Sequence, residues 1–241
     1  MRAGLKALYI RHFFRPGIVG LFVNPFYIAR KGLFQSILDL APKIRGRVLD
    51  VGCGYKPYQD LFYCSEYVGL ELDTPLNRAN NRGDVFYDGG VFPFEDRSFD
   101  TIIASEVLEH VFAPGVFLSE IHRVLRDGGG VLLTVPFVWD EHEQPLDYGR
   151  YTSYGLKYLL EQNGFDRIIL TKTVPDIRVI VQLLNCYLHK QVSTWNNYVK
   201  IITWAIFSAP LNIVGELLSK VLPANPDLFL NIVAFANKRD A

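Results

Sequence analysis

Acidic residues are absent from the first 38 positions of this 241-residue chain, although the whole sequence balances 25 Lys and Arg against 25 Asp and Glu. The balance provides no overall basic field, which argues against a nucleic-acid partner. Cysteine is scarce as well. Cys53, Cys64 and Cys186 are odd in number and widely spaced, which argues against a disulfide framework or a cysteine-ligated zinc site. We therefore expect reduced cysteines and a cytoplasmic protein.

The chain also lacks the third glycine of a dinucleotide-binding loop. Residues 48–54, VLDVGCG, have the pattern of a buried strand that ends near Asp50 and turns through Gly52 and Gly54. A pyrophosphate-binding loop would place another glycine at position 57, which is proline here. The turn therefore favours a nucleotide-type ligand without pyrophosphate, and a plain strand-to-helix turn is the alternative. S-adenosylmethionine carries ammonium and sulfonium charges that suit Asp50, and we predict that Asp50, Gly52, Cys53 and Gly54 bind it.

Further expected strands also end in polar residues. Residues 67–73 form a second one, in which Glu71 is placed to accept both ribose hydroxyls. Residues 84–87 and 99–104 follow as the third and fourth, with Asp88 after the third and Ser105 and Glu106 after the fourth. The carboxyl ends of parallel strands meet at one edge of a sheet. We therefore add Glu71, Asp88, Ser105 and Glu106 to the predicted cofactor site.

Strands and helices continue to alternate to the end of the chain. Helices are expected from about 113, ended by the glycines at 128–130, and from 153 to 162; strands are expected at 131–136, 165–174 and 228–236. Such alternation predicts an α/β fold with a mostly parallel sheet covered on both faces.

The ordered motifs resemble the class I S-adenosylmethionine-dependent methyltransferases, in particular the bacterial methyltransferase-11-like group. The matching stretches are residues 49–54, Asp88 with 92–94, 98–100, and 105–111 with the sequence SEVLEHV. The resemblance covers about residues 45–174 and a last strand near 228–238. It implies a Rossmann-like, doubly wound, seven-stranded sheet whose last strand is antiparallel.

Two segments lie outside this pattern. Residues 1–44 form a basic and aromatic extension before the predicted methyltransferase domain at 45–241, and residues 175–227 form an apolar helical insertion within it. The uncharged run 201–215 stops at Glu216, short of the roughly 20 residues that a spanning helix needs. We expect the two segments to pack together and to dock on the inner face of the membrane, with a sheet-edge cover or a homodimer interface as the alternatives.

The densest polar cluster is the loop at 139–152, which resembles a segment of methyltransferases from bacterial cell-surface glycan pathways. Its His142 is the predicted general base, because its unperturbed pKa lies near neutrality. His110 is the second catalytic candidate, and Arg150 with Tyr151 can anchor the loop. Adjacent loop residues rarely converge on one ion, so no metal site is predicted from Asp140, Glu141, His142 and Glu143.

The favoured function is methyl transfer to oxygen of a sugar or of a lipid-linked glycan intermediate. A methyltransferase for an apolar small molecule of quinone or polyketide type stays open, as does a protein that binds S-adenosylmethionine without catalysis. Amino methylation of nucleic acid would favour an Asn/Asp-Pro-Pro-aromatic tetrapeptide after the fourth strand, where this chain has residues 105–108, SEVL.

Overall fold

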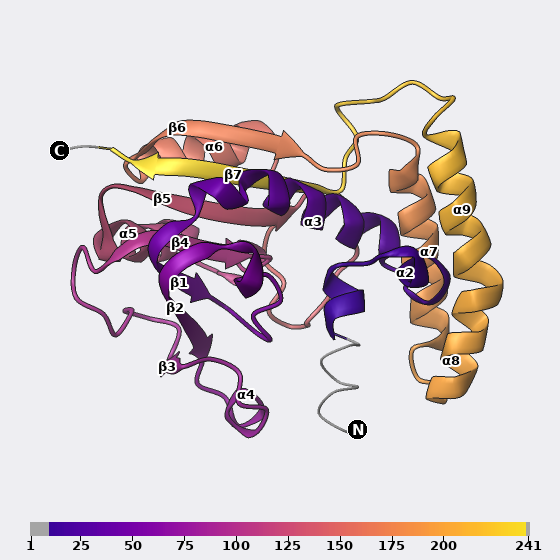
Figure 1. The fold of residues 1–241 in the computed structure, drawn as a ribbon, viewed down its shortest axis with the longest axis horizontal. Helices are drawn as coiled ribbons and strands as arrows, with labels where there is room; N and C mark the ends of the chain where they lie inside the picture. The colour runs from indigo at the N-terminus through magenta and orange to yellow at the C-terminus, as the bar shows by residue number, and fades with distance from the viewer. Residues whose placement is uncertain (1–9, 240–241) are drawn as a thin grey trace. The chain divides into compact units, whose positions relative to one another are not determined.

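The structure is a computed structural model that describes residues 10–239, and the described chain divides into two compact units (Figure 1). The sheet unit comprises residues 37–137, 141–171 and 232–239. The helical unit comprises residues 10–36, 138–140 and 172–231. The N-terminal segment and the insertion thus belong to one unit, and the division within the first segment falls at 36/37, where the sequence predicted 44/45.

The sheet unit is built on a seven-stranded sheet in the order β3-β2-β1-β4-β5-β7-β6. β1 pairs in parallel with β2 and β4, β2 with β3, and β4 with β5. In Figure 1, β7 runs opposite to β6. The predicted doubly wound, mostly parallel sheet is confirmed. The strands are β1 (Arg45–Val51), β2 (Tyr63–Leu72), β3 (Val85–Tyr87), β4 (Phe99–Ser105), β5 (Leu125–Pro136), β6 (Phe165–Lys172) and β7 (Asn231–Lys238).

Apolar side chains make the central strands the core of this unit. Val48, Leu49 and Val51 of β1 are fully buried, as are Ile102 and Ala104 of β4. Burial on both faces is what a parallel sheet covered by helices requires. The unit's helices are α4 (Pro75–Ala79), α5 (Pro114–Val124), α6 (Ser153–Gln162) and the end of α3.

The helix starts follow local sequence signals. α5 begins with Pro114, whose fixed φ suits a first turn, and it buries an apolar stripe that includes Leu118 and Ile121. α6 begins after Thr152, whose hydroxyl accepts a hydrogen bond of 3.0 Å from the N–H of Gly155. Its bounds are those that the sequence predicts.

The sequence predicted that the glycines at 128–130 end a helix. In the structure they lie inside β5 instead. α5 has already ended at Val124. A Cβ on Gly130 would lie 2.4 Å from Cζ of Phe235, and one on Gly129 would lie 2.9 Å from the carbonyl oxygen of Asp100. The glycines are therefore needed because neighbouring strands approach β5 closely here.

The helical unit contains α2 (Ile18–Val23), most of α3 (Tyr27–Leu40), α7 (Arg178–Val192), and α8 (Asn197–Thr203), which continues through a π-helical turn (Trp204–Ser208) into α9 (Ala209–Leu218). Asn212 joins the two sequence segments, because its Nδ2 donates to the Leu21 carbonyl at 3.0 Å and its Oδ1 accepts from Asn185 at 2.9 Å. Lys31 pairs with Glu216 at 3.0 Å. Met1 to Tyr9, with Arg2 and Lys6 of the predicted basic surface, lie outside the described residues.

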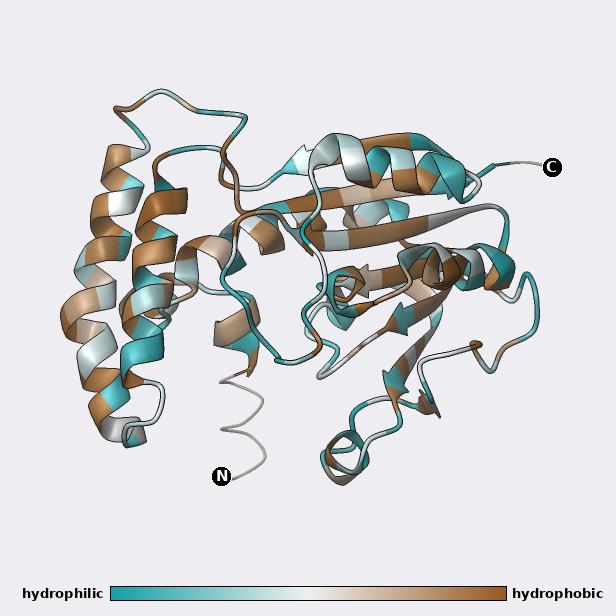
Figure 2. Ribbon diagram, turned by 180° about the vertical axis from the view of Figure 1, so that it is seen from behind, coloured by the Kyte–Doolittle hydropathy of each residue, from teal (hydrophilic) through white to brown (hydrophobic). Residues whose placement is uncertain are grey.

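One helix among the described residues is long and apolar enough to cross a membrane. It covers Val199–Leu218, 20 residues whose most apolar 18-residue window has a mean hydropathy of 1.6 and is 22% buried. Figure 2 shows the hydropathy along this helix. The sequence argument that the apolar run is too short was wrong, because the helix continues past Lys200 at one end and Glu216 at the other. Length and composition alone do not establish a span.

Candidate active site

The turn after β1 places a buried carboxylate next to two glycines with positive φ. Asp50 is 5% exposed, and its Oδ2 accepts a hydrogen bond of 2.6 Å from the hydroxyl of Tyr67 on β2. Burial raises the pKa of Asp50 to about 7, although the Tyr67 hydrogen bond and the Lys56 charge both lower it. A cation bound next to Asp50 would favour its charged form.

The next residues let a ligand approach the main chain. Gly52 has a φ of +66°, and a Cβ there would meet Cγ2 of Val107 at 2.6 Å. Gly54 has a φ of +51°, and a Cβ there would meet nothing within 4 Å. The N–H of Gly54 donates to Oε2 of Glu71 at 2.9 Å, which fixes this carboxylate of β2 beside the turn. Gly52 is thus needed for packing, whereas Gly54 borders open space.

Two other predicted cofactor residues have different surroundings. Cys53 is buried, and its side chain packs against Gly69 of β2. A Cβ added to Gly69 would lie only 2.6 Å from the Cys53 Sγ. Its main chain is then the part that a ligand could meet. Asp88 follows β3 in an exposed loop and accepts a hydrogen bond of 2.9 Å from the N–H of Gly90.

Ser105 and Glu106 at the end of β4 are tied to β5 through Thr134. The Thr134 hydroxyl lies 3.0 Å from Ser105 Oγ and donates to Glu106 Oε1 at 2.8 Å. It also accepts from the N–H of Glu106 at 2.9 Å. Glu106 has a φ of +56°, an uncommon value for a residue with a Cβ. Thr134 holds this strand end in place, and the sequence analysis missed it because nothing distinguishes it within a buried strand.

Both catalytic candidates lie together beside a buried acid. The rings of His110 and His142 are 4.9 Å apart in an edge-to-face arrangement. His110 Nε2 lies 3.9 Å from Oε1 of Glu109, whose side chain is fully buried. Burial, and next the charge of Glu106, raise the pKa of Glu109 well above its usual value. The sequence placed His110 and His142 on separate segments, and the fold brings them together.

A second layer of contacts orients the two imidazoles. His110 Nδ1 lies 2.7 Å from the carbonyl oxygen of Leu146, and His142 Nδ1 lies 3.3 Å from Oδ2 of Asp147. Asp147 is held by Arg150 through two hydrogen bonds of 2.6 and 2.7 Å. The Arg150 hydrogen bonds hold the pKa of Asp147 well below its usual range, and the loop-anchoring role expected of Arg150 agrees with this geometry. Of the other loop acids, Asp140 pairs with Lys190 at 2.9 Å within the helical unit.

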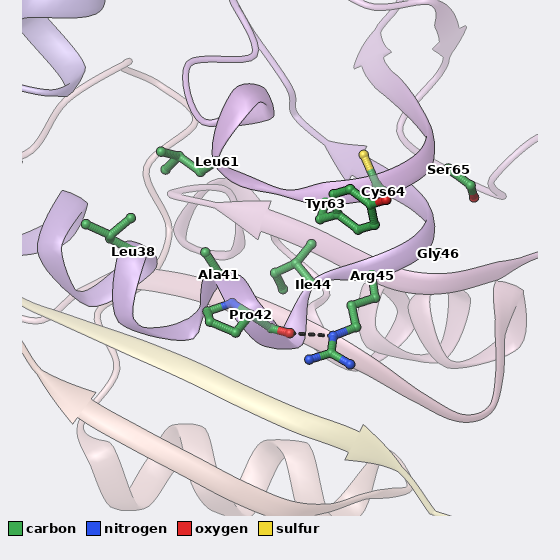
Figure 3. Close-up of a pocket in the computed structure, with 10 residues that line it drawn as sticks. All are labelled: Leu38, Ala41, Pro42, Ile44, Arg45, Gly46, Leu61, Tyr63, Cys64 and Ser65. Carbon is green, nitrogen blue, oxygen red and sulfur yellow. Dashed lines mark hydrogen bonds between the residues drawn. The ribbon is translucent and has the colours of Figure 1, made fainter.

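A hollow in the sheet unit lies elsewhere. It measures about 890 Å³ and is lined by the amino ends of β1 and β2, including Arg45, Gly46 and Tyr63 (Figure 3). In parallel strands these ends lie at the edge opposite to Asp50, Glu71 and Ser105. This hollow is therefore not the predicted cofactor site.

The contacts around the turn fit S-adenosylmethionine. Asp50 supplies a buried carboxylate for positive charge, Glu71 supplies a carboxylate at the end of the second strand, and Gly54 leaves the main chain open. When bound, this cofactor supplies an electrophilic methyl group.

Comparison with known proteins agrees with this fit. Residues 49–133 match the family profile described as a methyltransferase domain. Over 114 residues the chain is 36% identical to a fatty-acid O-methyltransferase of Mycolicibacterium smegmatis, and the match covers 42% of this chain and 41% of that protein. It is 30% identical over 128 residues to the sterol 24-C-methyltransferase erg6 of Schizosaccharomyces pombe, covering 46% and 33%. The chain thus spans about two fifths or less of these relatives.

Solved structures with the same fold include phosphoethanolamine N-methyltransferase 2 of Haemonchus contortus in complex with S-adenosyl-L-methionine, with a TM-score of 0.55, 19% identity, and coverage of 96% of this chain and 60% of that one. An Archaeoglobus fulgidus S-adenosylmethionine-dependent methyltransferase has a TM-score of 0.56 at 16% identity, covering 92% and 100%. The matched profile marks residues 49–133 as a methyltransferase domain, and the sheet has the class I S-adenosylmethionine-dependent methyltransferase fold.

Proposed function

We propose that this protein transfers the methyl group of S-adenosylmethionine to a hydroxyl oxygen of a sugar or of a lipid-linked glycan intermediate. The observation that carries the proposal is the meeting of His110 and His142, 4.9 Å apart, in the sheet unit. An alcohol is a poor nucleophile until a base accepts its proton, and imidazoles are suitable general bases near neutral pH.

The surrounding contacts are suited to alignment. Methyl transfer is an in-line displacement, so the protein must hold the acceptor oxygen, the methyl carbon and the sulfur in order and keep water out. Asp147 contacts Nδ1 of His142, and the Leu146 carbonyl contacts Nδ1 of His110. These contacts restrict the motion of both rings. The general-base role that the sequence assigns to His142 stays a prediction, and His110 is placed equally well for it.

Support for an acceptor with a lipid part comes from the relatives and from the helical unit. The names of the two relatives refer to fatty acids and sterols. The helical unit exposes large apolar side chains at helical spacing: Ile202, Ile206, Phe207, Val214 and Leu217 from α8 to α9, and Ile18, Val19 and Phe22 on α2. Soluble monomers rarely expose so many neighbouring apolar residues.

We propose further that this apolar surface rests in the inner leaflet of the cytoplasmic membrane without crossing it. The opposite side of the long helix is held by polar contacts inside the unit: Glu216 pairs with Lys31 at 3.0 Å and with Arg178 at 3.5 Å, and Asn212 is buried and hydrogen-bonded. A spanning helix would have to bring these groups into hydrocarbon. Basic residues such as Lys200 favour anionic headgroups.

The experiment is a transfer assay with purified full-length protein and S-adenosylmethionine labelled in the methyl group. Lipid-linked sugars, free sugars and fatty acids are offered separately, and mass spectrometry locates the methyl group. We expect label on a hydroxyl oxygen of the sugar portion. Label only on a carboxylate or an apolar ring would overturn the glycan proposal in favour of the apolar-small-molecule alternative. Cofactor binding without transfer to any acceptor class would favour the non-catalytic alternative.

A further inference from the structure

Three groups of metal-ligand type converge in the sheet unit. Glu109, His110 and His142 each offer one ligand atom, and the three atoms all lie within 4.8 Å of one another. Bonds of about 2.0–2.2 Å to a cation would bring such atoms to roughly 3.3 Å apart. Small rotations of the side chains cover that difference. Glu109 and His110 are neighbours in the short turn after β4, and His142 comes from the loop after β5.

Glu109 is an unusual residue for a buried position. Its side chain is fully buried, and neither carboxylate oxygen accepts a hydrogen bond from another described residue. Its main chain is held firmly, because its carbonyl oxygen accepts hydrogen bonds from the N–H groups of Tyr148 and Gly149 at 2.8 and 3.1 Å. A buried carboxylate that accepts no hydrogen bond is costly, and such groups usually have a close partner. A cation beside it would provide one.

The imidazoles are oriented as metal ligands commonly are. The Leu146 carbonyl can only accept a hydrogen bond, so Nδ1 of His110 carries the proton and the neutral ring has its lone pair on Nε2. That Nε2 is the atom that faces Glu109 at 3.9 Å. Nδ1 of His142 faces the carboxylate of Asp147, which Arg150 holds in turn. Carbonyl and carboxylate groups behind ligating histidines are the usual outer contacts of a metal site.

We propose that Glu109, His110 and His142 bind a divalent transition-metal ion. Two imidazoles and one carboxylate suit zinc, manganese or iron better than magnesium or calcium, which favour oxygen ligands. No metal was predicted from the sequence, where the candidate ligands were neighbours on one loop. The site proposed here combines one residue of that loop with two residues from a different strand end.

The role of the cation rests on the proposed methyl transfer to a hydroxyl. Three protein ligands leave a position for the acceptor oxygen, and a bound cation lowers the pKa of a hydroxyl that it holds. The acceptor's O–H bond breaks with loss of the proton to solvent, the C–O bond forms, and the C–S bond breaks with its electron pair on sulfur. With the cation bound, the imidazoles would be its ligands and the cation would activate the hydroxyl; without it, an imidazole would accept the proton.

The test measures metal binding without any acceptor. The purified chain is stripped with a chelator and titrated with Zn²⁺ and separately with Mn²⁺ by calorimetry. Co²⁺ is then added, because its NMR spectrum shows strongly shifted imidazole N–H proton signals when histidine is a ligand. We expect one ion per chain. Glu109→Gln, His110→Ala and His142→Ala should each weaken binding about 10-fold or more.

Glu143→Gln is the matched control, since its carboxylate also lies 3.9 Å from His110 Nε2 but is 76% exposed. It should leave the affinity unchanged. The proposal is overturned if no stoichiometric binding occurs, or if Glu143→Gln weakens binding as much as Glu109→Gln. Should a variant fail to fold, the Co²⁺ spectrum of the unmodified chain decides alone, because a spectrum without imidazole ligation also overturns the site. Metal binding with no methyl transfer would leave this site standing and remove the proposed function.

Discussion

The hydroxyl of Tyr67 donates a hydrogen bond of 2.6 Å to Oδ2 of Asp50, and this pair closes one side of the turn after β1. Without this hydrogen bond, the Lys56 charge alone would offset the cost of burying the Asp50 carboxylate. Burial raises its pKa to about 7 even so, and the predicted cofactor site should therefore respond to pH in the physiological range.

This pKa predicts how cofactor affinity depends on pH. The ammonium group that S-adenosylmethionine and S-adenosylhomocysteine share favours the charged form of Asp50, so affinity should rise as pH rises through about 7. Between pH 6 and pH 8 we expect about a 10-fold gain for S-adenosylhomocysteine, measured by calorimetry. Asp50→Asn should bind weakly and without this dependence. A wild-type affinity that is flat from pH 6 to 8 would contradict the prediction.

The same shift has the opposite effect on the stability of the protein without cofactor. The folded-state pKa of Asp50 is above its unfolded value of 3.8, so the unfolded chain releases its proton first as pH rises. The free energy of unfolding should therefore fall between pH about 4 and about 7. Denaturant titrations of wild type and Asp50→Asn isolate this contribution, which the variant should lack.

The two glycines of the turn should respond differently to substitution. Gly54→Ala adds a methyl group where nothing lies within 4 Å, so it should fold with a loss of about 1–2 kcal/mol from its positive φ. Because the methyl group enters the open space at the main chain, affinity for S-adenosylhomocysteine should fall about 10-fold or more.

Gly52→Val is expected to act through the fold instead. Its Cβ would overlap Val107, at a φ of +66°, so thermal unfolding should shift strongly downward before any effect on binding can be read. If Gly52→Val unfolds like wild type while Gly54→Ala is the unstable variant, this assignment of the two glycines is wrong.

These positions show what the sequence could and could not predict. The turn at 52–54 and the bounds of α6 follow from local signals, namely glycine spacing and an N-cap threonine, and such signals lie within a few residues of the structure they set. The pairing of Tyr67 with Asp50, and of Thr134 with Glu106, joins neighbouring strands and depends on register. The place of the glycines at 128–130 inside a strand could not be predicted, because the close approach of Phe235 leaves no signal near them in the sequence.

The histidine pair gives a prediction for turnover. His142→Ala and His110→Ala should each lower turnover about 100-fold, since each removes an imidazole that is expected either to accept the hydroxyl proton or to hold the cation that activates the hydroxyl. Affinity for S-adenosylhomocysteine should stay near wild type, which separates a loss of chemistry from a loss of fold. Near-normal turnover in His142→Ala with a large loss in His110→Ala would assign the step to His110 alone.

The last prediction concerns the apolar surface of the helical unit. Purified protein should sediment with vesicles that contain anionic lipid, and added salt should weaken binding because basic side chains contribute to it. Ile206→Glu places a charge in the middle of that surface, where the isoleucine is 58% exposed, and should reduce vesicle binding about 10-fold or more. Val116→Glu is the matched control: Val116 is 63% exposed on α5 of the sheet unit, and its substitution should change nothing. The alternative outcome is that the chain does not bind vesicles and elutes as a dimer that Ile206→Glu dissociates. In that case the apolar helices form an interface between two copies, and the proposal of a lipid-linked acceptor loses its main physical support.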